Sequence, residues 1–312
     1  MGVEEGSQST LHGREHGASA GQVVEDKGEP GVPQRHVEVR PSLVPLRIGV
    51  VDYLNSRPLA WSFRNGFHRD IFEPGFYPPA EVAVRLAAGE IDIGLLPSIE
   101  LQRIPGLRVL PGLCIAATHE ARSVLLVLAK PLESVRRIAL DRNSRTSAAL
   151  VEILLADSYG LKPELVSTAP DLDEMLQAAD AALLIGDPAL RVDRSAYRVL
   201  DLAAEWRRLT DLPFVFAVWA VRTGVAADGL VSYFRESLGQ GLEHLEELVA
   251  DSSRELDIDS AELRSYLTDH LSFEMGATEV AALEEFHRRA HAHGLIDALQ
   301  PVEVVGSLLP QP

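Results

Sequence analysis

From Leu46 onward, short apolar runs alternate with segments of helical periodicity, and this alternation restricts the possible folds of the chain more than any other feature. The runs predict strands at 48–51, 91–97, 107–117, 123–129, 137–140, 181–185 and 214–221. Helical spacing predicts helices over 79–89, 147–158, 230–249 and 279–293. Such an order is typical of α/β proteins with parallel sheets.

Two of the apolar runs, 123–130 and 214–222, lie where the composition changes, and we expect the chain to cross between two lobes there. The predicted first lobe comprises 46–128 together with 222–312, and the second comprises 129–221. We therefore expect a ligand cleft between the lobes, because small-molecule sites concentrate at domain interfaces.

Composition excludes several classes of function. The chain has 312 residues, of which 46% are hydrophobic, so it can bury a substantial core. Its net charge of −17 offers no basic stripe for nucleic acid. The single cysteine, Cys114, rules out an internal disulfide and lies in an apolar run, where a buried side chain is expected. No run approaches the roughly 18 apolar residues of a membrane span.

The first 45 residues differ from the rest of the chain. They are rich in Gly, Glu, Ser and Gln and poor in large apolar residues, which predicts a disordered tail. They have neither the basic start nor the apolar centre of a signal peptide. We therefore expect a cytoplasmic protein.

Four polar clusters follow predicted strands and are expected to line the cleft. Because ligands bind at the carboxyl ends of parallel strands, these are the candidate ligand-binding residues. They are Tyr53, Asn55, Ser56 and Arg57; Ser98; Ser144, Arg145, Thr146 and Ser147; and Gly186 and Asp187. Helix capping is the alternative role for the first two clusters, and it is favoured for Asp187, which precedes a proline.

The third cluster has the clearest chemistry. Ser144, Thr146 and Ser147 provide hydroxyl groups, and Arg145 provides a guanidinium, at the predicted start of a helix. Backbone N–H groups, the helix dipole and the positive charge together favour binding of a carboxylate. A capped, solvated turn is the alternative.

Six distinctive strings occur along the chain in this order: VDYLNSRPL, LAAGEIDIGLLPSIEL, ARSVLLV, LDRNSRTSAALVEILL, LLIGDPAL and EWRRLTDLPFVFAVWAV. In sequence and in order they resemble the menaquinone-biosynthesis family of chorismate dehydratases. The resemblance implies a type II periplasmic-binding-protein-like fold in a cytosolic enzyme without cofactor or metal. A related enzyme, dihydroxynaphthoate synthase, has a Cys-Pro-Asn-Asp-type first loop; the loop Tyr53-Leu54-Asn55-Ser56 favours the dehydratase.

The resemblance implies conversion of chorismate to 3-[(1-carboxyvinyl)oxy]benzoate and water, with Asn55 and Ser123 as the catalytic pair. Neither is a convincing base at neutral pH. We expect the enolpyruvyl carboxylate of the substrate to act as the base, with Asp187 as the alternative. The cluster 144–147 is expected to hold one substrate carboxylate, while Ser56 and Ser98 make other contacts. Arg57 either contributes positive charge or pairs with a surface carboxylate.

Other readings stay open at this point. The chain is alternatively a non-catalytic binding protein, or a related enzyme for another aromatic-pathway carboxylate. His287, His291 and His293 include a pair at helical spacing, for which a solvated helix face is expected rather than a metal site. A monomer or a homodimer is expected, with a small-molecule substrate and neither nucleic acid nor membrane as partner.

Overall fold

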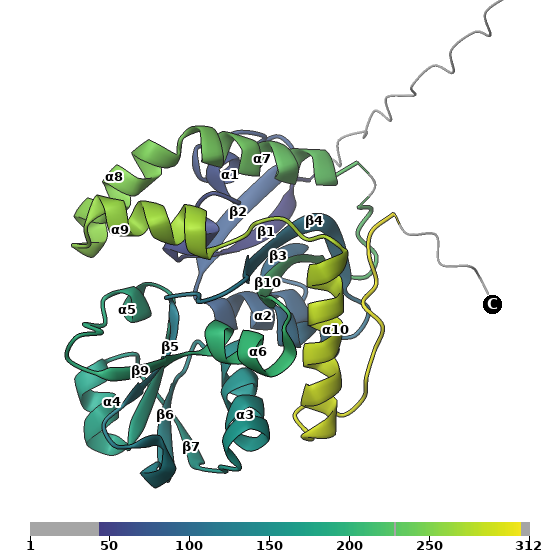
Figure 1. The fold of residues 1–312 in the computed structure, drawn as a ribbon. Helices are drawn as coiled ribbons and strands as arrows, with labels where there is room; N and C mark the ends of the chain where they lie inside the picture. Colours follow the sequence, from purple (N-terminus) through teal and green to yellow (C-terminus); the bar gives the residue numbers. More distant parts are fainter. Residues whose placement is uncertain (1–43, 228, 307–312) are drawn as a thin grey trace, which may run out of the picture. The chain divides into compact units, whose positions relative to one another are not determined.

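Two five-stranded sheets organise residues 44–227 and 229–306, the part of the chain that this computed structural model describes (Figure 1). The strands of the first sheet are β1 (Leu46–Val51), β2 (Phe72–Tyr77), β3 (Ile93–Pro97), β4 (Arg108–Ala117) and β10 (Phe214–Val221). Those of the second are β5 (Val124–Leu128), β6 (Arg137–Asp141), β7 (Glu164–Thr168), β8 (Ala181–Ile185) and β9 (Arg198–Asp201). The strand orders are β2-β1-β3-β10-β4 and β7-β6-β8-β5-β9.

Helices surround both sheets. They are α1 (Trp61–Arg64), α2 (Pro79–Ala87), α3 (Thr146–Tyr159), α4 (Leu172–Ala178), α5 (Asp187–Leu190), α6 (Leu202–Thr210), α7 (Val231–Glu243), α8 (Leu245–Leu256), α9 (Ser260–Ser265) and α10 (Ala277–Ala292). The short 3₁₀ helices are η1 (Leu54–Ser56), η2 (Ser98–Gln102) and η3 (Leu132–Ser134). The segment η4 (Tyr266–His270) is a π-helix.

The two sheets have matching topologies. In the first, β1 pairs in parallel with β2 and β3, while β10 lies antiparallel between β3 and β4. In the second, β6 pairs in parallel with β7 and β8, while β5 lies antiparallel to β8 and β9. Each sheet thus receives one antiparallel strand directly after the chain crosses from the other sheet. The expected two-lobed α/β class is confirmed.

The expected lobe boundaries need correction at both crossings. Strand β5 was assigned to the first lobe but pairs with β8 and β9 of the second sheet. Strand β10 was assigned to the second lobe but pairs with β3 and β4 of the first. The physical reason is that an apolar strand buries its backbone by pairing along its whole length within one sheet. The crossings are therefore made by the short segments 118–123 and 211–213.

Local sequence explains most element boundaries. Helix α3 ends at Gly160, which takes the left-handed conformation (φ 65°) that terminates helices. Strand β2 was not predicted because it contains Pro74 and Gly75, and proline is tolerated there because β2 is an edge strand. The helix expected over 230–249 is divided into α7 and α8 at His244, whose ring makes an edge contact with Trp61 at 4.2 Å between centroids.

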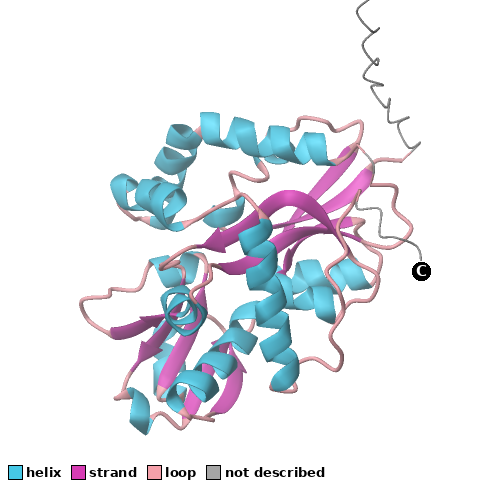
Figure 2. Cartoon of the chain, turned by 45° about the vertical axis from the view of Figure 1, so that its right-hand side comes forward, coloured by secondary structure: helices cyan, strands magenta, loops and turns pink. Residues whose placement is uncertain are grey.

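Helix α10 packs against both lobes (Figure 2). Leu283 lies in an apolar cluster with Val109 and Val218 of the first sheet. Phe286 and Ala290 belong to the core cluster that covers the second sheet. The helix therefore joins the two lobes on one side.

Asp92 joins three strand ends of the first sheet. Its carboxylate accepts hydrogen bonds from the backbone and guanidinium of Arg47, at the start of β1, at 3.0–3.1 Å. It also accepts two from Arg222, just after β10, at 2.8 and 3.0 Å. Burial raises the pKa of this carboxyl, but hydrogen bonds from both arginines outweigh burial and hold it at about 2.

The expected N-terminal tail, residues 1–45, lies outside the described residues except for its last two. The described residues belong to one compact unit, residues Val39–Pro312. Within the described ranges, no helix combines the length and apolar character needed to span a bilayer.

Replacing Asp92 with Asn should lower the free energy of unfolding by about 2 kcal/mol at neutral pH, because two arginines lose their shared charged acceptor. A depressed carboxyl pKa stabilises the fold above the ordinary value of 3.8, and this contribution is lost as pH falls toward about 2. Urea unfolding of wild type and Asp92→Asn at several pH values measures both effects. Asp70→Asn, at an exposed position, is the control; equal stability of the two variants would contradict the prediction.

Candidate active site

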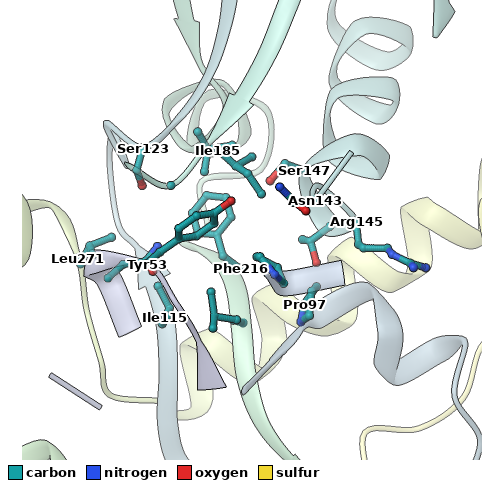
Figure 3. Close-up of a pocket in the computed structure, with 17 residues that line it drawn as sticks. Tyr53, Pro97, Ile115, Ser123, Asn143, Arg145, Ser147, Ile185, Phe216 and Leu271 are labelled. Atoms are coloured by element: carbon teal, nitrogen blue, oxygen red, sulfur yellow. The ribbon is translucent and has the colours of Figure 1, made fainter. Parts of the chain in front are cut away.

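A pocket lies between the two lobes, at the carboxyl ends of β1, β3, β6 and β8 (Figure 3). It holds about 590 Å³ of space, its opening to solvent included. Its apolar wall consists of Val51, Pro79, Pro97, Ile115, Val124, Ile185, Phe216, Ala217 and Leu271. Its polar lining consists of Tyr53, Asn55, Ser123, Asn143, Arg145, Thr146 and Ser147, together with Gly186. Among the described residues that line it there is no aspartate or glutamate.

Asn55 and Ser123 are joined by a third residue, Tyr266, which sequence reasoning missed. The Tyr266 hydroxyl donates a hydrogen bond to Ser123 Oγ at 2.8 Å. The Asn55 side chain interacts electrostatically with the same hydroxyl and lowers its pKa, an effect that burial outweighs. Tyr266 is only 1% exposed, and burial raises the pKa of its hydroxyl far above the ordinary value, so the phenol stays protonated. Its only sequence signal is a tyrosine within a polar segment.

Tyr53 closes the pocket against the second lobe. Its hydroxyl interacts electrostatically with the side chain of Asn143, which follows β6. Its ring packs on Gly186, where a Cβ would lie only 2.5 Å from Tyr53 Cδ2. Gly186 also has φ 61° and ψ −141°, a conformation that other residues rarely adopt. Glycine is therefore required at this contact between the lobes.

The N-terminus of α3 faces the same space. Thr146 and Ser147 begin the helix and line the pocket, and no side chain caps the helix start. Thr146 Oγ1 accepts a hydrogen bond from the Ile99 backbone N–H at 3.2 Å, which anchors the helix to η2 of the first lobe. The arrangement suits an anion, since helix N-termini attract negative charge.

Arg145 contributes to the pocket wall, but its guanidinium points away from Tyr53 and Ser123 (Figure 3). Arg145 Nη1 lies 3.7 Å from Glu100 Oε1, and Glu100 also pairs with Arg103 at 3.1 Å. The positive charge of Arg145 is thus partly neutralised by a buried carboxylate beside the pocket.

Three of the expected ligand residues have structural roles instead, which corrects the sequence-based expectation. Ser56 Oγ donates to the Val51 and Tyr53 carbonyls, and Ser98 Oγ donates to the Val215 carbonyl at 2.7 Å. Both hydroxyls therefore turn back to the backbone. Arg57 is buried and donates to Ser252 Oγ and Glu255 Oε2 at 2.9 and 2.7 Å, the carboxylate pairing that was its alternative role.

Asp187 and Ser144 also lie outside the pocket lining. Asp187 Oδ1 accepts a hydrogen bond from the Leu54 backbone N–H at 2.9 Å, which connects the start of α5 to η1 of the other lobe. Burial raises the pKa of Asp187, and the hydrogen bond from Leu54 opposes that rise. Ser144 Oγ is buried without a hydrogen-bond partner. Asp187 thus acts as a contact between the lobes.

His287 is buried at 1% exposure, so the expected solvated helix face is wrong for this residue. Its Nε2 lies 3.0 Å from the Ser98 carbonyl, and its Nδ1 lies 3.0 Å from Gln102 Nε2. A carbonyl only accepts, so Nε2 carries the proton and Nδ1 accepts from Gln102. His291 and His293 are exposed. Across the described residues, no cluster of three or more His, Cys, Asp or Glu side chains could hold a metal.

Comparison with known proteins identifies similar sequences. The family model described as menaquinone biosynthesis matches residues 46–292. A chorismate dehydratase of Thermus thermophilus is 31% identical over 242 residues, covering 72% of this chain and 87% of the relative. A chorismate dehydratase of Campylobacter jejuni is 25% identical over 257 residues, covering 79% of this chain and 98% of the relative.

Solved structures share the fold at low sequence identity. A protein from Archaeoglobus fulgidus aligns with a TM-score of 0.67 at 17% identity, covering 81% of this chain and 98% of that one. The periplasmic aliphatic sulphonate binding protein of Escherichia coli aligns with a TM-score of 0.59 at 17% identity, covering 87% and 97%. These similarities support a periplasmic-binding-protein-like fold.

The buried His287 should make stability depend on pH. Burial lowers the pKa of its imidazole from 6.5 to about 4. Between these values the unfolded chain takes up a proton that the folded protein excludes, so the free energy of unfolding falls as pH drops through this window. Urea unfolding across the window should show a weaker pH dependence for His287→Gln than for wild type. His291→Gln, at an exposed position of α10, should behave like wild type; identical pH slopes in all three proteins would contradict the assignment.

Proposed function

The chain belongs to the menaquinone-biosynthesis family, and we propose that it converts chorismate to 3-[(1-carboxyvinyl)oxy]benzoate and water. The observation that carries this proposal is the 31% identity to a chorismate dehydratase over 87% of that enzyme's length. The pocket supports it with Asn55 and Ser123, the expected catalytic pair, on one wall. A binding protein is not favoured, because the two relatives matched by sequence are chorismate dehydratases.

The reaction is an elimination that produces an aromatic ring. A proton leaves the ring carbon that bears the enolpyruvyl ether, and the hydroxyl leaves the neighbouring carbon. Together they form water, and the remaining electrons complete the benzene ring. The charge that develops upon proton loss is delocalised onto the ring carboxylate. The enzyme must therefore hold a dianion, stabilise negative charge and assist departure of the hydroxyl.

The N-terminus of α3 is the proposed site for one substrate carboxylate. Thr146 and Ser147 line the pocket at the uncapped first turn of a 14-residue helix. Asn143, which precedes this turn and also lines the pocket, can donate through its amide. These neutral donors stabilise an anion without adding a titratable group. Such donors suit this protein, because its overall charge of −17 otherwise repels an anionic substrate.

Ser123 is the proposed donor to the departing hydroxyl. Its Oγ accepts from Tyr266, so its own proton is available to a ligand in the pocket. Asn55 has a buried Oδ1 without a hydrogen-bond partner and lines the same pocket. We assign Asn55 to the hydroxyl or ether side of the ring, where a substrate hydroxyl can donate to this oxygen.

The substrate's enolpyruvyl carboxylate is the proposed base. The described residues of the pocket lining include no carboxylate side chain, and burial keeps the pKa of the nearby tyrosine hydroxyls high. Asp187, the alternative base, is engaged by the Leu54 backbone outside the lining. The protein then supplies orientation and electrostatic stabilisation, which account for a large part of many enzymatic rate enhancements. A cytoplasmic location stays a prediction.

Purified protein incubated with chorismate alone should form a product lighter by one water, detected by mass-resolved chromatography. Asn55→Ala and Ser123→Ala should each lower kcat/KM by about 100-fold or more, because each removes a polar contact to the reacting ring. Ser232→Ala, at an exposed serine, is the matched control and should retain activity. Tight chorismate binding without product would instead indicate a binding protein. If the protein showed no binding and formed no product, chorismate would be excluded as the substrate.

Asp187→Asn separates the two candidate bases. Asparagine keeps an oxygen that can accept from the Leu54 N–H but cannot act as a base, so kcat should stay within about tenfold of wild type if the substrate supplies the base. Steady-state kinetics and chorismate titration measure kcat and affinity separately. A loss of several orders of magnitude in kcat with unchanged affinity would show that Asp187 is the base.

A further inference from the structure

Three side chains from distant parts of the chain meet beside the pocket. Asn55 belongs to η1, Ser123 precedes β5 at the first crossing, and Tyr266 begins η4. Tyr266 and Ser123 are 143 positions apart in sequence. The Tyr266 hydroxyl hydrogen-bonds to Ser123 and interacts electrostatically with Asn55.

The donors and acceptors in this cluster have one consistent direction. Asn55 Oδ1 is buried without a hydrogen-bond partner. The Tyr266 hydroxyl donates its proton to Ser123 Oγ. Ser123 is left with its proton free, and Asn55 is left with its oxygen free. The pocket is therefore offered one donor and one acceptor at defined positions.

The backbone at Tyr266 is adapted to this contact. Helix α9 ends at Ser265, and the chain continues as the π-helical turn η4 before Leu271, which lines the pocket. π-helical turns are rare and occur frequently at functional sites, because the wider turn changes the direction of a side chain. The turn at Tyr266 brings its hydroxyl to Ser123, which directly precedes β5 of the second lobe.

We propose that Tyr266 is a positioning residue that orients the side chains of Ser123 and Asn55 toward the substrate. This inference rests on the proposed function. By occupying the Ser123 acceptor, Tyr266 directs the Ser123 proton toward the departing hydroxyl. Its electrostatic interaction with the Asn55 side chain helps to hold that side chain at the pocket lining. Tyr266 itself does not line the pocket and has no direct contact with the substrate.

Tyr266→Phe tests this role because it removes only the hydroxyl. We expect kcat for chorismate to fall by about 10- to 100-fold while KM changes by less than about threefold, since orientation affects the transition state more than binding. Tyr159→Phe is the matched control, because the Tyr159 hydroxyl bonds to Glu205 away from the pocket. A wild-type kcat in Tyr266→Phe, or an equal loss in Tyr159→Phe, would overturn the proposal.

A double-mutant cycle separates positioning from general stability. Tyr266→Phe should have little further effect on kcat in a Ser123→Ala protein, because the group that it orients is already absent. Losses that multiply in the double variant would overturn the proposal. If Tyr266→Phe does not fold, Asn55→Ala and Ser123→Ala provide the same test with Tyr266 in place: their losses should be less than multiplicative, and independent losses would overturn it.

The proposed function and the hydrogen-bond network are judged separately. Wild-type protein that forms no product from chorismate overturns the proposed function. The network is then judged from the melting temperatures of wild type, Tyr266→Phe, Ser123→Ala and the double variant. Losses in melting temperature that are less than additive support coupling through the hydroxyl, and additive losses overturn it.

Discussion

The carboxylate of Asp201 holds the segment that brings Ser123 to the site. Asp201 ends β9 and caps α6, accepting from the Ala203 and Ala204 N–H groups at 3.0 and 3.3 Å. The same carboxylate accepts from Ala121 and Arg122 at 3.0 and 2.7 Å. Arg122 has φ 62°, a left-handed conformation that costs free energy for a non-glycine residue. These bonds stabilise the crossing segment, and Ser123 follows directly.

The pocket depends on contacts between the lobes more than on either lobe alone. Tyr53 packs on Gly186, Leu54 donates to Asp187, and Thr146 accepts from the backbone of η2. Each contact joins a residue of the first lobe to a strand end or helix start of the second. The side chains that they enclose are neutral donors and acceptors, which suits orientation and charge stabilisation of an anionic substrate.

Local patterns predicted much of the fold. The strands at 181–185 and 214–221 have the expected bounds, and α3 differs from the expected range 147–158 by one residue at each end. The errors have physical causes. Strand β2 lies at an edge and contains proline and glycine, so it lacks a continuous apolar run. The sequence could not predict to which sheet β5 and β10 belong. An apolar strand at a crossing can pair with either sheet, and only the assembled structure shows which one it joins.

The sequence by itself determined the fold class, the family and the polar clusters that follow the strands, because periodicity and motifs are local properties. Only the tertiary structure decided which hydroxyl groups face the pocket, because a serine at a helix start can donate either to a ligand or back to a carbonyl. Ser56 and Ser98 donate back to the backbone, whereas Ser123 is available to a ligand. Tyr266 could be found only in three dimensions, since its hydroxyl bonds to a residue 143 positions away.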